Sequence, residues 1–162
     1  MQFYSTNRKT SPVSLREAVV RGLAADRGLF MPEVIRRFPP AFYQNMKEMT
    51  LREISFVVAE AFFGEDVEAG KLKEIVDETL NFDIPLVQVA DNRYSLELFH
   101  GPTLAFKDVG ARFMARLLAY FNKQEGERQV NVLVATSGDT GSAVANGFLD
   151  VPGVKVFVLY PQ

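Results

Sequence analysis

The feature that most constrains the fold is a strand–turn–helix–strand pattern in the last third of the chain. Val130–Ala135 is an almost entirely apolar run, which is typical of a strand buried on both faces of a parallel sheet. A turn with two glycines at 136–141 leads into a helix over about 140–149, and Pro152-Gly153 ends that helix. Val154–Tyr160 is a second apolar run. This order predicts a βαβ unit with two parallel strands.

One parallel pair is too small to form a complete α/β sheet, so further strands are expected outside this sequence. The 162 residues are 48% hydrophobic, which is enough apolar material for a folded core. The chain stops at Gln162, directly after the second predicted strand. We therefore expect it to be the front part of a longer protein.

The N-terminal half has a different, helical pattern. Ser14 and Thr50 each precede an apolar helical face and have a glutamate three residues later, which is the spacing of a capping box. A third helix is predicted over about 70–80, and Pro39-Pro40 separates the first helix from the other two. We expect residues 1–80 to form a mostly helical N-terminal region.

From Phe82 onward the pattern changes to that of an α/β domain. Two short runs, 86–89 and 94–98, have strand-like composition and are joined by a polar turn, so they predict a hairpin. A long helix follows from about Phe106, with one broad apolar stripe. We expect residues 81–162 to be the first part of this second domain.

Composition excludes several classes of function. The chain has 18 Lys and Arg against 20 Asp and Glu, without the basic excess of a nucleic-acid-binding protein. It has no cysteine, which excludes disulfides and zinc–thiolate sites and fits a reducing cytoplasm. No apolar stretch approaches the ~20 residues of a membrane span. We expect a cytoplasmic protein with no nucleic-acid or membrane partner and no metal site.

The turn at residues 136–141, Thr-Ser-Gly-Asp-Thr-Gly, is the first candidate site. It follows a strand and opens a helix, where open α/β sheets bind ligands and where helix N–H groups favour anions. It lacks the glycine spacing of a dinucleotide loop and the lysine of a Walker loop. Because Asp139 would repel phosphate, a carboxylate site using Ser137, Thr140 and backbone N–H groups is the better prediction. The alternative is a plain turn with Asp139 or Thr140 as helix cap.

The second candidate site is the segment Glu97–Asp108, Glu-Leu-Phe-His-Gly-Pro-Thr-Leu-Ala-Phe-Lys-Asp. Lys107 falls near the first turn of the long helix, where the helix dipole disfavours a cation. This makes Lys107 a candidate nucleophile, the alternative being a surface lysine paired with Asp108. His100 is the only histidine, and it is either a hydrogen-bonded structural residue or a substrate contact.

Together, the Glu97–Asp108 segment and the Ala-Thr-Ser-Gly-Asp-Thr-Gly run at 135–141 resemble the threonine synthase family. The match is specific, because about a dozen contiguous residues are followed by a second loop in the expected order. It extends to Gly-Leu-Phe-Met-Pro at 28–32 and to the closing strand. The whole chain resembles the N-terminal part of that family, whose members are longer.

The resemblance implies a pyridoxal 5'-phosphate enzyme of the tryptophan synthase β fold group, with a three-layer, mostly parallel sheet. It implies conversion of O-phosphohomoserine and water to threonine and phosphate, the activity of a carbon–oxygen lyase. Lys107 matches the lysine that holds the cofactor covalently. Asp139 matches a residue near the cofactor ring, and the loop that receives the substrate carboxylate corresponds to Ser137, Gly138, Thr140 and Gly141. His100 is a further candidate for substrate contact.

Two alternatives remain open from the sequence. One is another enzyme of the same fold group, such as a serine or threonine dehydratase. The other is a noncatalytic homologue that binds the cofactor, although the retained Lys107 argues against it. The 162-residue chain alone is expected to be inactive and to expose apolar surface that favours self-association.

Overall fold

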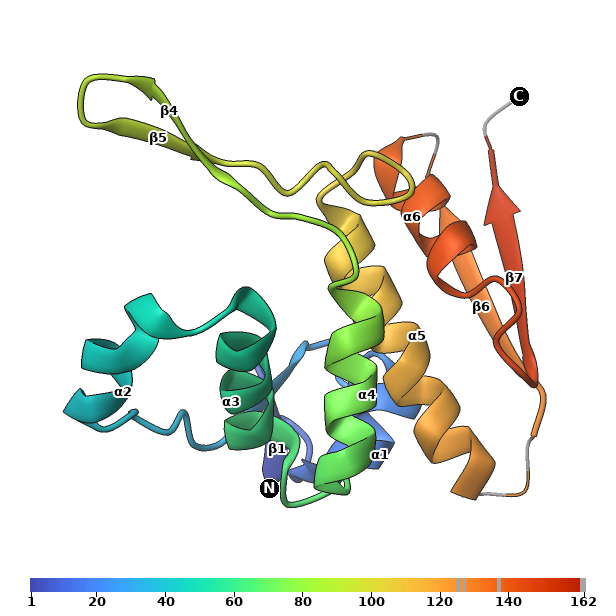
Figure 1. The fold of residues 1–162 in the computed structure, drawn as a ribbon. Helices are drawn as coiled ribbons and strands as arrows, with labels where there is room; N and C mark the ends of the chain where they lie inside the picture. The colour runs from blue at the N-terminus through green and yellow to red at the C-terminus, as the bar shows by residue number, and fades with distance from the viewer. Residues whose placement is uncertain (125, 127, 137, 161–162) are drawn as a thin grey trace. The chain divides into compact units, whose positions relative to one another are not determined.

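The computed structural model describes residues 1–124, 126, 128–136 and 138–160 (Figure 1). The chain divides into two compact units, Met1–Glu78 and Thr79–Gln162. The order of helices and strands places it in the α/β class, and this sequence-based prediction is confirmed.

The first unit contains a small antiparallel sheet that the sequence patterns did not predict. Its strands are β1 (Gln2–Ser5), β2 (Val13–Ser14) and β3 (Phe30–Pro32), in the order β2-β1-β3. Phe3 of β1 is buried and is paired with residues of both neighbouring strands. The expectation of a mostly helical region named none of these strands, because strands of two to four residues are too short to have a clear alternation pattern.

The helices of this unit are α1 (Leu15–Arg21), α2 (Pro40–Asn45), α3 (Leu51–Phe63) and α4 (Ala69–Thr79), whose last residue lies in the second unit, with a short 3₁₀ turn at Met46–Glu48. The helix α2, within the segment after Pro39, was not predicted.

The capping box at Thr50 is confirmed. The Glu53 N–H donates to Thr50 Oγ1 over 3.3 Å, and the Thr50 N–H donates to Glu53 Oε2 over 2.7 Å. At α1, the Glu17 N–H donates to Ser14 Oγ over 3.2 Å as expected, but the Glu17 carboxylate pairs with Arg21 at 3.0 Å.

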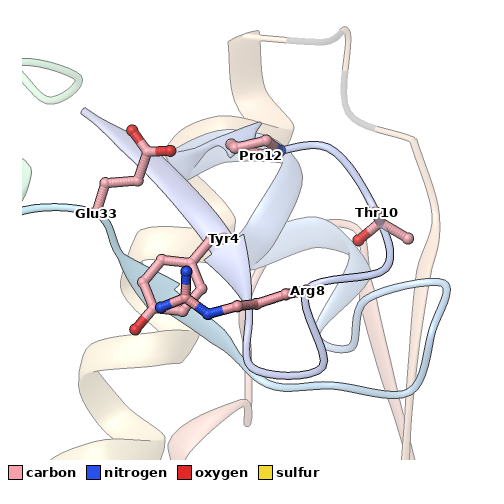
Figure 2. A pocket seen from close by; sticks show the side chains of 5 residues that line it. All are labelled: Tyr4, Arg8, Thr10, Pro12 and Glu33. Atoms are coloured by element: carbon pink, nitrogen blue, oxygen red, sulfur yellow. The ribbon is translucent and has the colours of Figure 1, made fainter.

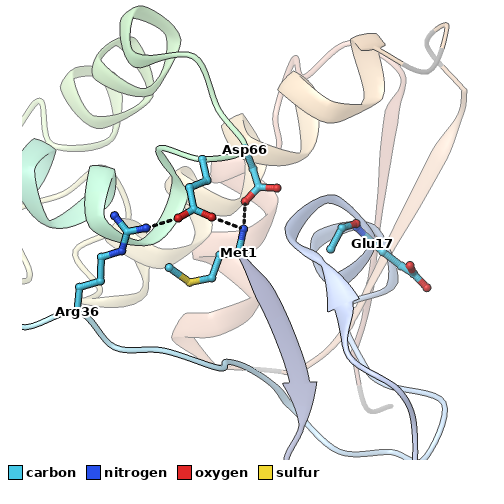
Figure 3. A network of polar contacts seen from close by, with 6 residues as sticks. Met1, Glu17, Arg36 and Asp66 are labelled. Carbon is cyan, nitrogen blue, oxygen red and sulfur yellow. Dashed lines mark hydrogen bonds and ion pairs between the residues drawn. The ribbon is translucent and has the colours of Figure 1, made fainter.

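The Met1 amino group anchors β1 to the segment that follows α3 (Figure 3). Its nitrogen lies 2.9 Å from Glu65 Oε2 and 3.1 Å from Asp66 Oδ2, and Arg36 also pairs with Glu65. Hydrogen bonds to these two carboxylates raise the pKa of the amino group. The hydrogen bond with the Met1 ammonium holds the pKa of Glu65 below its ordinary value.

The second unit begins with the predicted hairpin, β4 (Leu86–Ala90) and β5 (Arg93–Leu96), which pair antiparallel. Then follow α5 (Lys107–Gln124), β6 (Val130–Ala135), α6 (Asp139–Gly147) and β7 (Val154–Leu159). β6 and β7 pair in parallel, from Val130 opposite Val154 to Ala135 opposite Leu159. The predicted βαβ unit is therefore confirmed.

α6 packs against both α5 and the β6–β7 pair (Figure 1). Burial alternates along both strands, and Leu133 and Phe157 are 69% and 47% exposed. The prediction that these strands are buried on both faces is wrong for this chain, because α6 lies against one face of the pair. The apolar run alone does not reveal whether a second layer is present.

Candidate functional site

Two charged side chains from separate motifs meet at one end of the second unit. Lys107 is the first residue of α5, and Asp139 is the first residue of α6, just after β6. The Lys107 Nζ lies 3.6 Å from the Asp139 Oδ2, and the two side chains are 31% and 67% exposed. The N-terminal ends of α5 and α6 lie at the same end as the carboxyl ends of β6 and β7 (Figure 1). This is the end of a parallel sheet where ligands bind.

Lys107 does not pair with Asp108, so the alternative predicted from the sequence is wrong. The Lys107 ammonium lies over the Phe106 ring, 4.2 Å from its centroid, and faces Asp139. Asp108 is completely buried and accepts hydrogen bonds from Thr103 instead. Lys107 therefore lies at an accessible position between an aromatic ring and a carboxylate.

The 136–141 turn enters α6 without a side-chain cap. Gly138 is the N-cap residue, so the alternative with Asp139 or Thr140 as cap is wrong. The Gly138 N–H donates to Thr136 Oγ1 over 3.1 Å. Asp139 and Thr140 are exposed. Ser137, the other predicted hydroxyl of this turn, lies outside the described residues.

Gly141 has a packing reason to be glycine. It is buried, and a Cβ at this position would lie 3.1 Å from the Thr136 carbonyl oxygen and 3.7 Å from a Val158 methyl group. The absence of a side chain lets α6 start close to the strands. Gly141 thus sets the position of the turn, whatever the turn binds.

His100 has a carboxylate partner on its own segment. Its Nε2 lies 2.7 Å from Glu97 Oε2, and its ring stacks on Phe99 with the centroids 4.8 Å apart. The side chain is 40% exposed. This arrangement matches the structural interpretation of His100, while leaving the ring reachable from solvent.

The first unit has a separate hollow that the sequence patterns did not indicate. A cavity of about 370 Å³ lies beside β1 (Figure 2) and is lined by Tyr4, Arg8, Thr10, Pro12 and Glu33. The Arg8 guanidinium lies 4.5 Å from the centroid of the Tyr4 ring. These residues come from β1, the loop after it and the position that follows β3, so no local motif joins them.

The described ranges, which omit residues 125, 127, 137, 161 and 162, contain no cluster of three or more His, Asp or Glu side chains that could bind a metal ion. Within the same ranges, no helix has the length and apolarity needed to cross a membrane.

Known proteins resemble this chain along its whole length. Residues 2–80 match the family model described as threonine synthase N terminus. Threonine synthases of Serratia marcescens and Escherichia coli are 41% and 40% identical over 162 residues, which is 100% of this chain and 37% of each relative.

Solved structures give the same result. The crystal structure of threonine synthase from Escherichia coli matches 100% of this chain and 37% of its own, at 40% identity and a TM-score of 0.90. The PLP-bound threonine synthase from Brucella melitensis matches with a TM-score of 0.93 at 35% identity, over 100% of this chain and 36% of its own. By its fold, the chain therefore belongs to a class of larger α/β proteins, of which it covers the N-terminal part. Within that class, the chain corresponds to the N-terminal portion of threonine synthases, which confirms the resemblance drawn from its motifs.

Proposed function

We infer that this chain is the N-terminal part of a pyridoxal-phosphate-dependent threonine synthase. The reaction converts O-phosphohomoserine and water to L-threonine and phosphate, and the enzyme acts in the cytoplasm as a lyase. The observation that carries this proposal is the approach of Lys107 Nζ to within 3.6 Å of Asp139. Those two residues belong to the two motifs by which the chain resembles the family.

The residues at this end of the second unit fit the cofactor. A primary amine is needed for covalent attachment of pyridoxal phosphate, and Lys107 offers one that is 31% exposed. When bound, pyridoxal phosphate withdraws electrons from the substrate carbon next to the nitrogen. Lys107 would hold the cofactor and then, once freed by substrate, carry protons. Asp139 would hold the amine by charge and contact the cofactor ring.

The turn before α6 is proposed to receive the substrate carboxylate. Gly138 starts the helix without a side-chain cap, so the N-terminal end of α6 is free of a competing side-chain acceptor from that residue. Helix N-termini favour anions, and Thr140 adds a hydroxyl. Ser137, Gly138, Thr140 and Gly141 are assigned to this turn by resemblance, and His100 is assigned to substrate contact on the same ground.

The chain spans 37% of the length of the relatives it matches, so the complete activity is proposed for the longer protein. Residues 1–80 would be the N-terminal region, and residues 81–162 the first part of the cofactor-binding domain. The chain by itself is expected to be inactive. The exposed apolar side chains of β6 and β7 support the proposal that it associates with itself when isolated.

The experiment that tests this function uses the complete protein that contains this chain. Borohydride reduction followed by peptide mapping should place a pyridoxyl group on Lys107, and O-phosphohomoserine should release phosphate and threonine. Lys107→Ala should abolish both. Lys123→Ala, at the other end of α5, should abolish neither. A pyridoxyl group on another lysine, or turnover of serine or threonine in place of O-phosphohomoserine, would refute the assignment.

A further inference from the structure

The residue after Lys107 carries a completely buried carboxylate. Asp108 has 0% exposure and is the second residue of α5. Its Oδ1 accepts a hydrogen bond from the Thr103 hydroxyl over 2.6 Å, and its Oδ2 accepts one from the Thr103 N–H over 2.9 Å. Within the described ranges, no lysine, arginine or histidine lies within 4 Å of this carboxylate as an ion-pair partner. Burying a carboxylate is costly unless hydrogen bonds satisfy it, so Asp108 depends on Thr103.

The backbone on the other side of this carboxylate is shaped to admit it. Gly101 is buried, and a Cβ there would lie 2.5 Å from Asp108 Oδ2 and 2.9 Å from Asp108 Cβ. The Leu104 N–H donates to the Gly101 carbonyl over 3.0 Å, and Leu104 has a φ of 57°. Residues other than glycine rarely adopt this left-handed backbone conformation, and they keep it only where the surrounding structure holds them in place. The segment therefore forms a tight turn around the Asp108 carboxylate.

This turn fixes the backbone from which Lys107 extends. The Asp108 N–H donates to the Ala105 carbonyl over 3.0 Å, and the Asp108 side chain ties Thr103 to the first turn of α5. Lys107 lies between these two attachments. Because Asp108 does not pair with Lys107, its effect on the amine acts through the backbone and not through direct charge pairing.

We propose that Asp108 is a positioning residue for Lys107. Its buried carboxylate, held by Thr103 and given room by Gly101, sets where the Lys107 amine reaches relative to Asp139. This inference rests on the proposed function of Lys107 and adds to it a role for Asp108, Thr103 and Gly101.

The test uses the complete protein with four variants. Asp108→Asn keeps the size of the side chain but offers one acceptor oxygen for two donors. Thr103→Val removes one donor, whereas Thr103→Ser keeps both. Asp91→Asn, in the exposed hairpin turn, is the control for loss of a carboxylate.

The first readout needs no cofactor. Lysines of the cofactor-free protein are acetylated at limiting reagent, and the rate at Lys107 is measured by peptide mapping relative to Lys123. The second readout is the absorbance band of the bound cofactor. The third is kcat and KM for phosphate release. Thermal unfolding is measured alongside.

Asp108→Asn and Thr103→Val are expected to change the relative acetylation rate of Lys107, to shift the cofactor band, and to lower kcat about tenfold to a hundredfold with little change in KM. Thr103→Ser and Asp91→Asn should match the parent protein. If both disruptive variants lower only the unfolding temperature and leave the acetylation rate, band and kcat unchanged, Asp108 is structural and the proposal is wrong. If Asp108→Asn does not fold, Thr103→Val decides.

The two proposals fail in different ways. A parent protein without a pyridoxyl group at Lys107 refutes the proposed function. The acetylation rate at Lys107 in the variants still decides whether Asp108 positions that amine.

Discussion

Two helical glycines in the second unit provide a matched test of how α5 and α6 pack. A Cβ at Gly147, the last residue of α6, would lie 3.0 Å from the Ala111 carbonyl carbon and 3.1 Å from the Ala111 Cβ. These are backbone-level contacts on α5, so they cannot be relieved by a side-chain rotation. A Cβ at Gly110, in the first turn of α5, would meet nothing within 4 Å among the described residues.

The two substitutions to alanine should therefore have opposite signs. Gly110→Ala replaces a flexible residue in a helix and should stabilise the protein by about 0.4–1 kcal/mol. Gly147→Ala gains at most about 1 kcal/mol of helix propensity but forces α5 and α6 apart, and overpacking costs about 1–3 kcal/mol. We expect a net loss of about 1 kcal/mol for Gly147→Ala, because the steric cost exceeds a propensity gain that is small at a helix end.

Urea unfolding of the complete protein, followed by circular dichroism, measures both changes. Amide hydrogen exchange measures the local stability of α5 and α6, and exchange should be faster in both helices for Gly147→Ala. If Gly147→Ala stabilises the protein as much as Gly110→Ala, or if exchange in α5 is unchanged, the close contact of these helices at Ala111 is refuted.

Thr50, Met1 and Thr140 each allow a separate test. Thr50→Ala should destabilise α3 by about 1 kcal/mol, since a side-chain cap is lost, and Thr50→Ser should restore it in urea unfolding. The pKa of the Met1 amino group is raised by Glu65 and Asp66, so its contribution to stability is complete below the ordinary pKa of ~8 and is lost as the pH rises through the raised value. The unfolding temperature of the protein with a free Met1 amine should therefore fall between pH 7 and 10. An N-acetylated form should lack this part of the fall, and equal pH profiles for the two forms would contradict the prediction. Thr140→Ala should lower kcat/KM for O-phosphohomoserine by the equivalent of about 1–3 kcal/mol, and unchanged kinetics would return the turn to a purely structural role.

Short-range sequence patterns made much of the second unit predictable. The βαβ unit follows from the order of nearby residues: the apolar run Val130–Ala135, the glycine turn, and the apolar run after Pro152-Gly153. The structure has the predicted strand, helix and parallel strand. The capping box at Thr50, in the first unit, could be predicted in the same way, because both of its hydrogen bonds join residues three apart. The family resemblance also came from contiguous motifs.

Long-range contacts decided the rest. β1, β2 and β3 are short strands that exist because Phe3 pairs with partners ten and twenty-nine positions away along the chain. An apolar run does not specify how many layers cover it, so the sequence predicted that the chain exposes apolar surface but not which face of β6 and β7 is exposed. Lys107 was identified from its motif, but only the packing of α5 on α6 selected Asp139 over Asp108 as its partner. The adjacent carboxylate was the obvious sequence choice, yet the turn at Gly101 directs it inward to Thr103, and that geometry depends on the folded backbone.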